Sequence, residues 1–161
     1  MKKMMVEKGI CVGCRFCEIV CSLSHCPKGE VNTKKARIHV YSEPRTGVDY
    51  PNVCRNCDNP PCARACPTGV INRNEQLGNM KLNEEACTAC GKCVEACPFH
   101  GVQTDIDNGK PLFCDLCGGD PMCVKFCRAL PHVGARTLNY MEPEAWREQH
   151  NAWLARPKIE E

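Results

Sequence analysis

Sixteen of the seventeen cysteines stand in four short runs of four, and no other feature of the sequence constrains the fold as strongly. In chain order, the runs are Cys11, Cys14, Cys17 and Cys21; Cys54, Cys57, Cys62 and Cys66; Cys87, Cys90, Cys93 and Cys97; and Cys114, Cys117, Cys123 and Cys127. Only Cys26 falls outside them. Cysteine at this density indicates a scaffold held either by disulfides or by metal.

Runs one and three have the C-x2-C-x2-C-x3-C spacing of bacterial 4Fe-4S ferredoxins. Three closely spaced thiolates can wrap a loop around three corners of one cubane. We expect the fourth cysteine to begin a short helix that points away and to bind the neighbouring cluster, so that each run needs a partner run. The middle gaps of runs two and four are longer, and their prolines and glycines suit tight turns around a cube.

Zinc and disulfides are the two alternatives to iron–sulfur clusters. A zinc site joins two C-x2-C pairs across a long spacer, whereas here a third and a fourth cysteine follow at once in every run. The start of the chain has a lysine pair but no apolar stretch of secretory length, and no segment approaches the roughly 20 apolar residues of a spanning helix. We therefore expect a soluble protein of the cytoplasm, where thiolates bind metal rather than form disulfides.

The endings of the runs indicate which of them pair. Runs two and three both end in Cys-Pro, and the segments VIN and MKL between them flank a polar stretch with Gly78, which predicts a strand-turn-strand connection. Residues 54–102 then form an inner two-cluster ferredoxin module. Residues 1–53 and 103–140 form an outer half whose two runs serve each other. Sequential pairing, of run one with two and of three with four, stays open on spacing alone.

Nested pairing gives four ligands to each of four clusters. Cluster A would be bound by Cys11, Cys14, Cys17 and Cys127; cluster B by Cys21, Cys114, Cys117 and Cys123; cluster C by Cys54, Cys57, Cys62 and Cys97; and cluster D by Cys66, Cys87, Cys90 and Cys93. The fold class expected is α+β and dominated by its cofactors, with two nested bacterial-ferredoxin-like modules of short strands and helices.

The motifs resemble a family. CVGCRFCEIVC, PNVCRNCDNPPCARACPTGVI, CGKCVEACPFHGV and CDLCGGDPMCVKFC are similar to the four-cluster electron-transfer subunits of molybdenum and tungsten oxidoreductases, including those that serve dimethyl sulfoxide reductase, formate dehydrogenase and carbon monoxide dehydrogenase. The resemblance covers about residues 9 to 140 and implies the nested pairing. The compact CDLCGGDPMC is most similar to the small iron–sulfur subunits of tungsten-dependent aldehyde oxidoreductases. This resemblance implies a hetero-oligomer, in which the partner is a large pterin-containing catalytic subunit and the electron acceptor is a flavin protein or a ferredoxin.

Cofactors would also replace part of the core. Leu, Ile, Val and Phe make up only about a fifth of the chain, so metal binding must contribute to folding, and we expect the metal-free chain to be largely unfolded. Four clusters with sixteen thiolates would shift the formal net charge from +2 to about −6.

The remaining residues predict few other sites. A C-terminal tail at 141–161 is expected to form a helix from about Glu142 or Pro143 that stops before Pro157, with Trp146, Trp153 and Leu154 on one face. Packing on its own domain is favoured for this helix, with docking to a catalytic subunit as the alternative. Cys26 is expected to be structural, and His25, His39, His100 and His132 to serve in hydrogen bonds or at the surface.

The sequence predicts no catalytic site of its own. It contains no Ser-His-Asp set, P-loop or GxGxxG, and every clustered reactive residue is accounted for as a ligand. The leading hypothesis is a non-catalytic oxidoreductase subunit that relays single electrons. The alternatives are a free-standing polyferredoxin, a subunit of a hydrogenase or of a formate or carbon monoxide dehydrogenase, and a metal-based regulator of nucleic acid, which the weak basic patterning disfavours.

Overall fold

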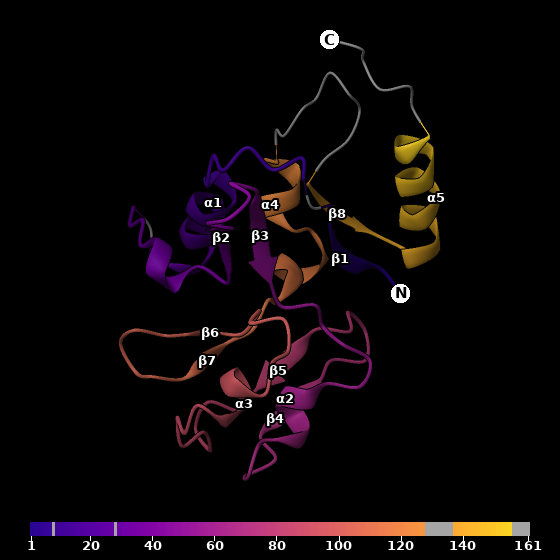
Figure 1. Ribbon diagram of the computed structural model, residues 1–161. Helices are drawn as coiled ribbons and strands as arrows, with labels where there is room; N and C mark the ends of the chain where they lie inside the picture. Colours follow the sequence, from indigo (N-terminus) through magenta and orange to yellow (C-terminus); the bar gives the residue numbers. More distant parts are fainter. Residues whose placement is uncertain (8, 28, 128–136, 156–161) are drawn as a thin grey trace.

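The computed structural model describes residues 1–7, 9–27, 29–127 and 137–155, without the side chains of Trp153 and Leu154, and shows an α+β fold of short elements (Figure 1). The strands are β1 (Lys3–Val6), β2 (Ile38–Ser42), β3 (Asp49–Val53), β4 (Ile71–Arg73), β5 (Met80–Leu82), β6 (Gln103–Thr104), β7 (Pro111–Leu112) and β8 (Leu138–Met141). The α-helices are α1 (Phe16–His25), α2 (Pro61–Arg64), α3 (Lys92–Glu95), α4 (Met122–Lys125) and α5 (Pro143–Leu154), and the 3-10 turns are η1 (Thr33–Lys35) and η2 (Leu116–Gly119).

The described strands pair in four two-stranded antiparallel sheets: β1 with β8, β2 with β3, β4 with β5, and β6 with β7. The β4–β5 hairpin confirms the predicted strand-turn-strand connection, with Ile71 opposite Leu82. Gly78 lies in its turn with φ of 72°, in the left-handed region that glycine enters without steric cost.

Strands from near the start and near the end of the described chain pair in one sheet. Lys3 lies opposite Met141 and Val6 opposite Leu138, so strands from the first and the last part of the chain close the same half of the molecule. Met4 and Leu138 on this sheet are both buried. Neither strand was predicted from the sequence.

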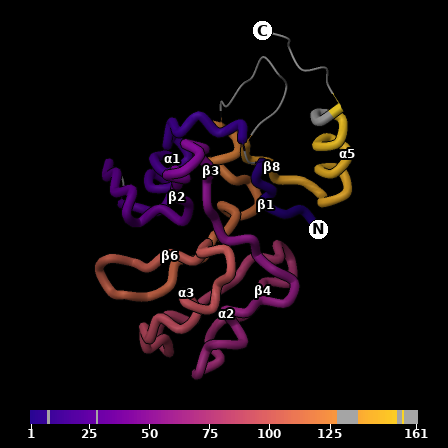
Figure 2. Tube along the Cα trace, viewed as in Figure 1, coloured from indigo at the N-terminus to yellow at the C-terminus, as the bar shows by residue number. Residues whose placement is uncertain are grey.

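The short helices form two pairs that follow the nested order of the runs. Helix α1, which begins within run one, packs on α4 of run four, and α2 of run two packs on α3 of run three. Figures 1 and 2 show the first pair in the upper half with β1, β2, β3 and β8, and the second pair in the lower half with β4 and β5. The β6–β7 hairpin lies with the lower half in both views.

The expected position of these helices is corrected by the structure. We expected the fourth cysteine of each run to begin a helix, but α2 contains Cys62 and ends before Cys66, and α3 contains Cys93 and ends before Cys97. The reason is that three intervening residues make about one helical turn, so the turn itself spans the gap between the third and the fourth cysteine.

Sulfur fills much of the core. Beside apolar residues such as Ile38, Val53 and Leu116, the buried cluster includes seven cysteines: Cys21, Cys54, Cys62, Cys93, Cys97, Cys114 and Cys123. These thiols occupy positions that aliphatic side chains fill in an ordinary domain. The centre of each half is therefore built around cysteine.

Helix α5 spans Pro143–Leu154, within the predicted bounds. It contacts β1 and β8, and His150 Nδ1 lies 2.5 Å from Glu7 Oε2 while its ring stacks on Trp146 at 4.9 Å between centroids. The helix thus packs on its own domain, as the favoured prediction had it. The side chains of Trp153 and Leu154, like His132, lie outside what the structure describes. Among the described helices, none has the length and apolar character needed to cross a membrane.

Candidate iron–sulfur centres

Four pockets in the structure are each lined by four cysteines. Pocket A is lined by Cys11, Cys14, Cys17 and Cys127; pocket B by Cys21, Cys114, Cys117 and Cys123; pocket C by Cys54, Cys57, Cys62 and Cys97; and pocket D by Cys66, Cys87, Cys90 and Cys93. Each encloses about 290 to 340 Å³ of space free of protein atoms, including its opening to solvent. Every pocket thus brings together three cysteines of one run and one cysteine of another.

One backbone feature recurs in all four runs. The residue before the second cysteine has a positive φ: 65° at Gly13, 49° at Asn56, 52° at Ala89 and 57° at Leu116. A left-handed residue at this point reverses the chain within C-x2-C, so that successive thiols face one space. Three of these residues are not glycine, and their conformation costs energy that the surrounding fold must supply.

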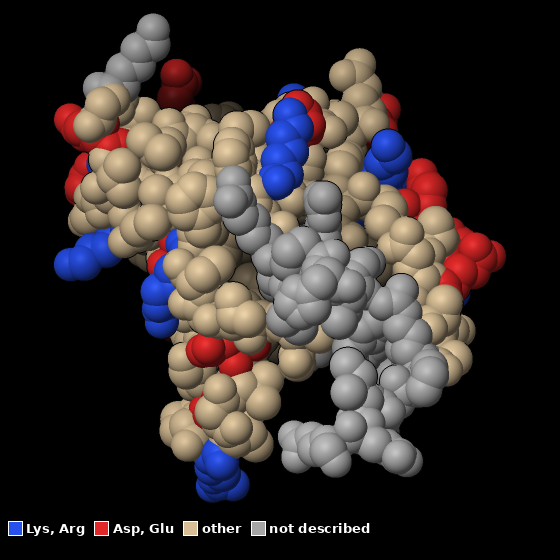
Figure 3. Space-filling model, turned by 90° about the horizontal axis from the view of Figure 1, so that it is seen from above, with Lys and Arg blue, Asp and Glu red and all other residues tan. Residues whose placement is uncertain are grey.

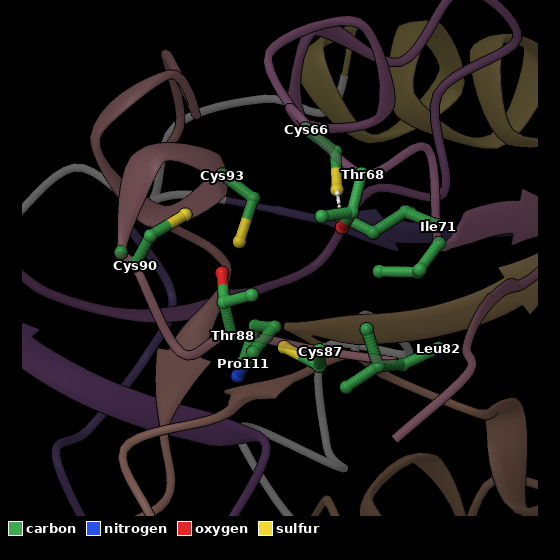
Figure 4. A pocket seen from close by; sticks show the side chains of 11 residues that line it. Cys66, Thr68, Ile71, Leu82, Cys87, Thr88, Cys90, Cys93 and Pro111 are labelled. Carbon is green, nitrogen blue, oxygen red and sulfur yellow. Dashed lines mark hydrogen bonds between the residues drawn. The ribbon is translucent and has the colours of Figure 1, made fainter. Parts of the chain in front are cut away.

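Pocket D shows the arrangement directly. Figure 4 shows the sulfur atoms of Cys66, Cys87, Cys90 and Cys93 turned toward a common space, with Pro111 of β7 beside them. The thiol of Cys66 has a lowered pKa, chiefly because it hydrogen bonds to the Thr68 hydroxyl. The residues that line pocket D include no charged side chain apart from the cysteines.

Pocket C explains the long middle gap of run two. Pro60 and Pro61, which lie in that gap, line the pocket, so the additional residues wrap around it. The backbone N–H of Gly101 donates to the sulfur of Cys97 at 3.4 Å. Arg55 also lines this pocket and is half-buried.

Pocket B is bordered by charged groups. His25 Nε2 lies 3.0 Å from the Asp115 carboxylate, and His25 Nδ1 lies 3.7 Å from the sulfur of Cys21. The backbone N–H of Arg37 donates to that sulfur at 3.3 Å. The Nε and Nη1 atoms of Arg37 are buried without a hydrogen-bond acceptor, although Nη1 lies 3.7 Å from Asp115. One ligand atom each from His25, Asp115 and Cys117 lie within 4.8 Å of one another.

Pocket A lies at an apolar part of the surface. Phe16 and Phe126 line it and meet edge to face at 5.8 Å between centroids. Arg15 also lines it, and its Nη1 donates to the buried carboxylate of Glu18 at 3.1 Å. The same carboxylate accepts from the backbone N–H of Val40 at 2.5 Å.

Burial raises the pKa of many of these thiols. The pKa of Cys17 is raised to about 12, and those of Cys54 and Cys93 to about 11, in each case mainly by desolvation of the thiolate. The pKa of Cys114 is raised well above its ordinary value by the same cause. Burial therefore opposes the thiolate form of these side chains. A bound cation would neutralise the charge of the thiolates, and iron would do so.

The residues fit a 4Fe-4S cluster in each pocket. Four thiols supply the ligands, and N–H groups of Arg37 and Gly101 point at ligand sulfurs, an interaction that stabilises thiolate charge. The buried guanidinium atoms of Arg37 have no acceptor on the protein, and an anionic group in pocket B would provide one.

The pockets follow one another through the molecule. Thiols of adjacent pockets are close enough for their charges to interact, and Asn56 links the two halves where pockets B and C meet. Its side-chain amide donates to the Cys114 carbonyl at 3.4 Å and accepts from the Met80 N–H at 3.2 Å. The neighbouring thiol pairs are Cys17 with Cys123, Cys54 with Cys114, and Cys62 with Cys93.

Cys26 lies apart from these sets. It is half-buried at the end of α1, its sulfur lies 3.5 Å from the Ser22 hydroxyl, and it lines none of the four pockets. Among the histidines, His39 hydrogen bonds to the Ala36 carbonyl and His25 to Asp115, in agreement with the predicted hydrogen-bonding roles.

The fold and the cysteine-lined pockets are those expected of an iron–sulfur protein of the ferredoxin class. The 4Fe-4S dicluster domain family matches residues 46–134, and the chain belongs to this family. The match decides between iron–sulfur clusters and zinc in favour of 4Fe-4S.

Similar proteins include a polyferredoxin-like subunit and an electron transport protein. The chain is 41% identical over 139 residues to the polyferredoxin-like subunit of the aliphatic sulfonate oxidoreductase of Pyrococcus furiosus, covering 85% of this chain and 79% of that one. It is 32% identical over 169 residues to the electron transport protein HydN of Escherichia coli K12, covering 89% and 94%. A chain of the active site complex BamBC of benzoyl coenzyme A reductase, bound to 1,5-dienoyl-CoA, has a similar fold with a TM-score of 0.52 at 24% identity over 96% and 89% of the two chains.

The sequence predicted a hydrogen-bonding or surface role for His25, but it did not predict that charged groups border the pockets. His25 lies four residues after Cys21, one helical turn, and that spacing was a usable signal for its position beside the sulfur. Asp115 stands between Cys114 and Cys117, but its contact with His25 joins positions 90 residues apart, and no local pattern predicts it. Arg55 is visible in the motif, whereas its place in the pocket is not.

Proposed function

We propose that this protein is the electron-transfer subunit of an oxidoreductase complex, relaying single electrons through four 4Fe-4S clusters. One end of the relay would meet a catalytic subunit that carries a tungsten or molybdenum pterin, such as an aldehyde oxidoreductase. The other would meet a flavin protein or a ferredoxin. The chain has no catalytic site of its own in this proposal, and the complex is a cytoplasmic hetero-oligomer.

The observation that carries the proposal is the succession of pockets A, B, C and D, each lined by four cysteines. In this assignment each set of cysteines holds one cluster, with the nested ligand sets predicted from the sequence. Contacts of α1 with α4 and of α2 with α3 support the nested modules, 54–102 within 1–53 and 103–140, with 141–161 as a helical tail. Pro111 of the outer segment also lines pocket D, so the two modules share that boundary.

A 4Fe-4S cluster supplies a one-electron couple, and the residues of the chain do the rest. They bind it with thiolates, donate N–H groups to its ligands and limit the access of water by burial. Cys14 and Cys90, in the terminal pockets A and D, are exposed, whereas three of the four cysteines in each of the middle pockets are buried. This pattern suits electrons that enter and leave at the two ends.

The relatives support a subunit more than a free carrier. The Pyrococcus furiosus relative is a polyferredoxin-like subunit of an oxidoreductase, and a probable anaerobic dimethyl sulfoxide reductase chain of Escherichia coli is 29% identical over 168 residues. On the face shown in Figure 3, Lys and Arg are scattered among Asp, Glu and uncharged residues rather than gathered in a basic patch. That face gives no support to the nucleic-acid alternative.

Metal analysis tests the cluster count. Protein purified without oxygen is expected to contain about 16 iron and 16 sulfide per chain. About 8 of each would reduce the relay to two clusters and refute this part of the proposal.

Purification of the tagged chain from its natural host tests the partner. We expect a complex with a larger subunit in which elemental and pterin analyses find tungsten or molybdenum together with the pterin. A monodisperse brown protein of 17.9 kDa would instead favour the free-standing polyferredoxin. A partner without either metal would refute the pterin enzyme.

A further inference from the structure

Pocket C differs from the other pockets in the balance of charge along its wall. In pocket A, Arg15 is paired with Glu18, and in pocket B, Arg37 faces Asp115. The wall of pocket D has no charged side chain besides the cysteines. Pocket C has Arg55, and no carboxylate lines it.

The guanidinium of Arg55 has no ion pair or hydrogen bond within the part of the chain that the structure describes. The nearby acidic residue of run two, Asp58, is largely exposed and is held by Lys3 and by Arg73, the latter at 3.0 Å. Its charge is therefore already balanced. Arginine stays protonated in proteins, so Arg55 leaves an uncompensated positive charge beside the cysteines of pocket C.

Pocket C, like pocket B, is also buried enough for a nearby cation to have a large effect. Cys54, Cys62 and Cys97 are all buried, and a low dielectric environment opposes the additional negative charge of a reduced cluster. Pocket C lies between pockets B and D, with Cys54 near Cys114 on one side and Cys62 near Cys93 on the other. A centre in the middle of a relay that is harder to reduce than its neighbours adds an uphill step and slows the passage of electrons.

We propose that Arg55 raises the reduction potential of the cluster held in pocket C and offsets the effect of burial. The cluster in the middle of the relay can then be reduced by its neighbours. The step concerned is the transfer of one electron from a reduced cluster in a neighbouring pocket. That cluster is oxidised as the cluster of pocket C is reduced, and no bond or proton changes place. Arg55 is a positioning residue that acts through its charge. The inference rests on the proposed function, because it requires a cluster in pocket C.

The test compares holoproteins at fixed solution potentials. Wild type, Arg55→Gln, Arg55→Met and Arg55→Lys are poised with dithionite and mediators without oxygen, and the fraction of each cluster that is reduced is read from electron paramagnetic resonance spectra. The variant Cys57→Ser perturbs a ligand of pocket C and identifies which signal belongs to that cluster. Arg64→Gln is the matched control, because Arg64 lies in the same run on α2 but is exposed.

With Arg55→Gln or Arg55→Met, the ratio of reduced to oxidised cluster in pocket C is expected to fall about tenfold, or about 59 mV for a one-electron couple. Arg55→Lys keeps the charge and should stay within about threefold of wild type, while Arg64→Gln should leave the ratio unchanged. The ratio for the cluster of pocket D should change much less in every variant, which separates a charge effect from general loosening of the fold.

An unchanged ratio in pocket C, in a neutral variant with the iron content of wild type, would overturn the inference. If neither neutral variant retains its iron, the order in which the clusters of the wild-type protein are reduced tests the inference instead. The more buried cluster in pocket C should be reduced no later than that of pocket D, and reduction only after pocket D would count against Arg55. Wild type that binds far less iron than four clusters require contradicts the proposed function instead, so the two failures are distinguishable.

Discussion

The substitution Gly101→Ala tests whether close backbone packing holds pocket C in place. A Cβ atom at this position would lie 2.6 Å from the carbonyl oxygen of Val53 and 2.9 Å from the backbone nitrogen of Cys54. Both contacts are with backbone, so no side chain can turn aside to relieve them. Gly101 also donates its N–H to Cys97, and Gly101→Ala should therefore displace two ligands of pocket C together.

The expected cost follows from the geometry. Since real Cβ contacts essentially never fall below 3.0 Å, the segment at Val53 or at Gly101 must move by several tenths of an ångström. Overpacking of this kind costs about 1 to 3 kcal/mol, and a clash between two backbones belongs at the upper end, about 3 kcal/mol. For a chain of this length that lowers the melting temperature by about 6 to 12 °C.

The measurement is thermal loss of the visible cluster absorbance without oxygen, at one scan rate, because unfolding with loss of metal is irreversible. Gly69→Ala is the matched control: its φ is 63°, but no atom lies within 4 Å of the added Cβ, so only backbone strain of about 1 kcal/mol is expected. Gly101→Ala should melt clearly below Gly69→Ala. If it melts at the same temperature or higher, the close approach to Val53 does not constrain the fold.

Three further predictions concern strain, protons and the sheet that joins the chain ends. Ala89→Gly should raise stability by about 1 kcal/mol without loss of iron, because φ is 52° there and the side chain is exposed; a lower melting temperature would contradict this. Leu138→Ala should cost about 3 kcal/mol, because the side chain is 1% exposed, and denaturation of wild type and variant in parallel measures it. Burial raises the pKa of Cys17 to about 12 and that of Cys54 to about 11 in the folded chain, and in an unfolded chain both thiols have their ordinary pKa of about 8.5, so in either state they are protonated at about pH 7 before metal binds. Cluster assembly should then release about one proton per ligand cysteine and weaken as pH falls. Titration in weak buffer measures the protons released, and assembly without proton release would contradict the prediction.

The parts of this molecule that sequence predicts are those set by local spacing. Cysteines three or four positions apart must share a loop, so the composition of each run could be read directly, and the Cys-Pro endings pointed to the inner pair. The β4–β5 hairpin and α5 also have local signals, in a glycine turn and in the proline residues near the ends of the helix.

What sequence did not predict depends on contacts between distant positions. The pairing of Lys3 with Met141 joins residues 138 positions apart in two four-residue strands, too short to carry a clear alternation. The approach of His25 to Asp115 and the placement of Arg55 in pocket C depend on how the loops are folded around the pockets. Asn56 adopts a left-handed conformation that its motif permits but does not require.

The sheet of β1 and β8 imposes an order of events during synthesis. All four cysteines of pocket C, and all four of pocket D, have been translated once Cys97 has been made. Pocket A must wait for Cys127, and the half that contains it closes only when β8 reaches β1. Because chains emerge from their N-terminal end, the eight cysteines of pockets C and D are all present before either outer pocket has its full set.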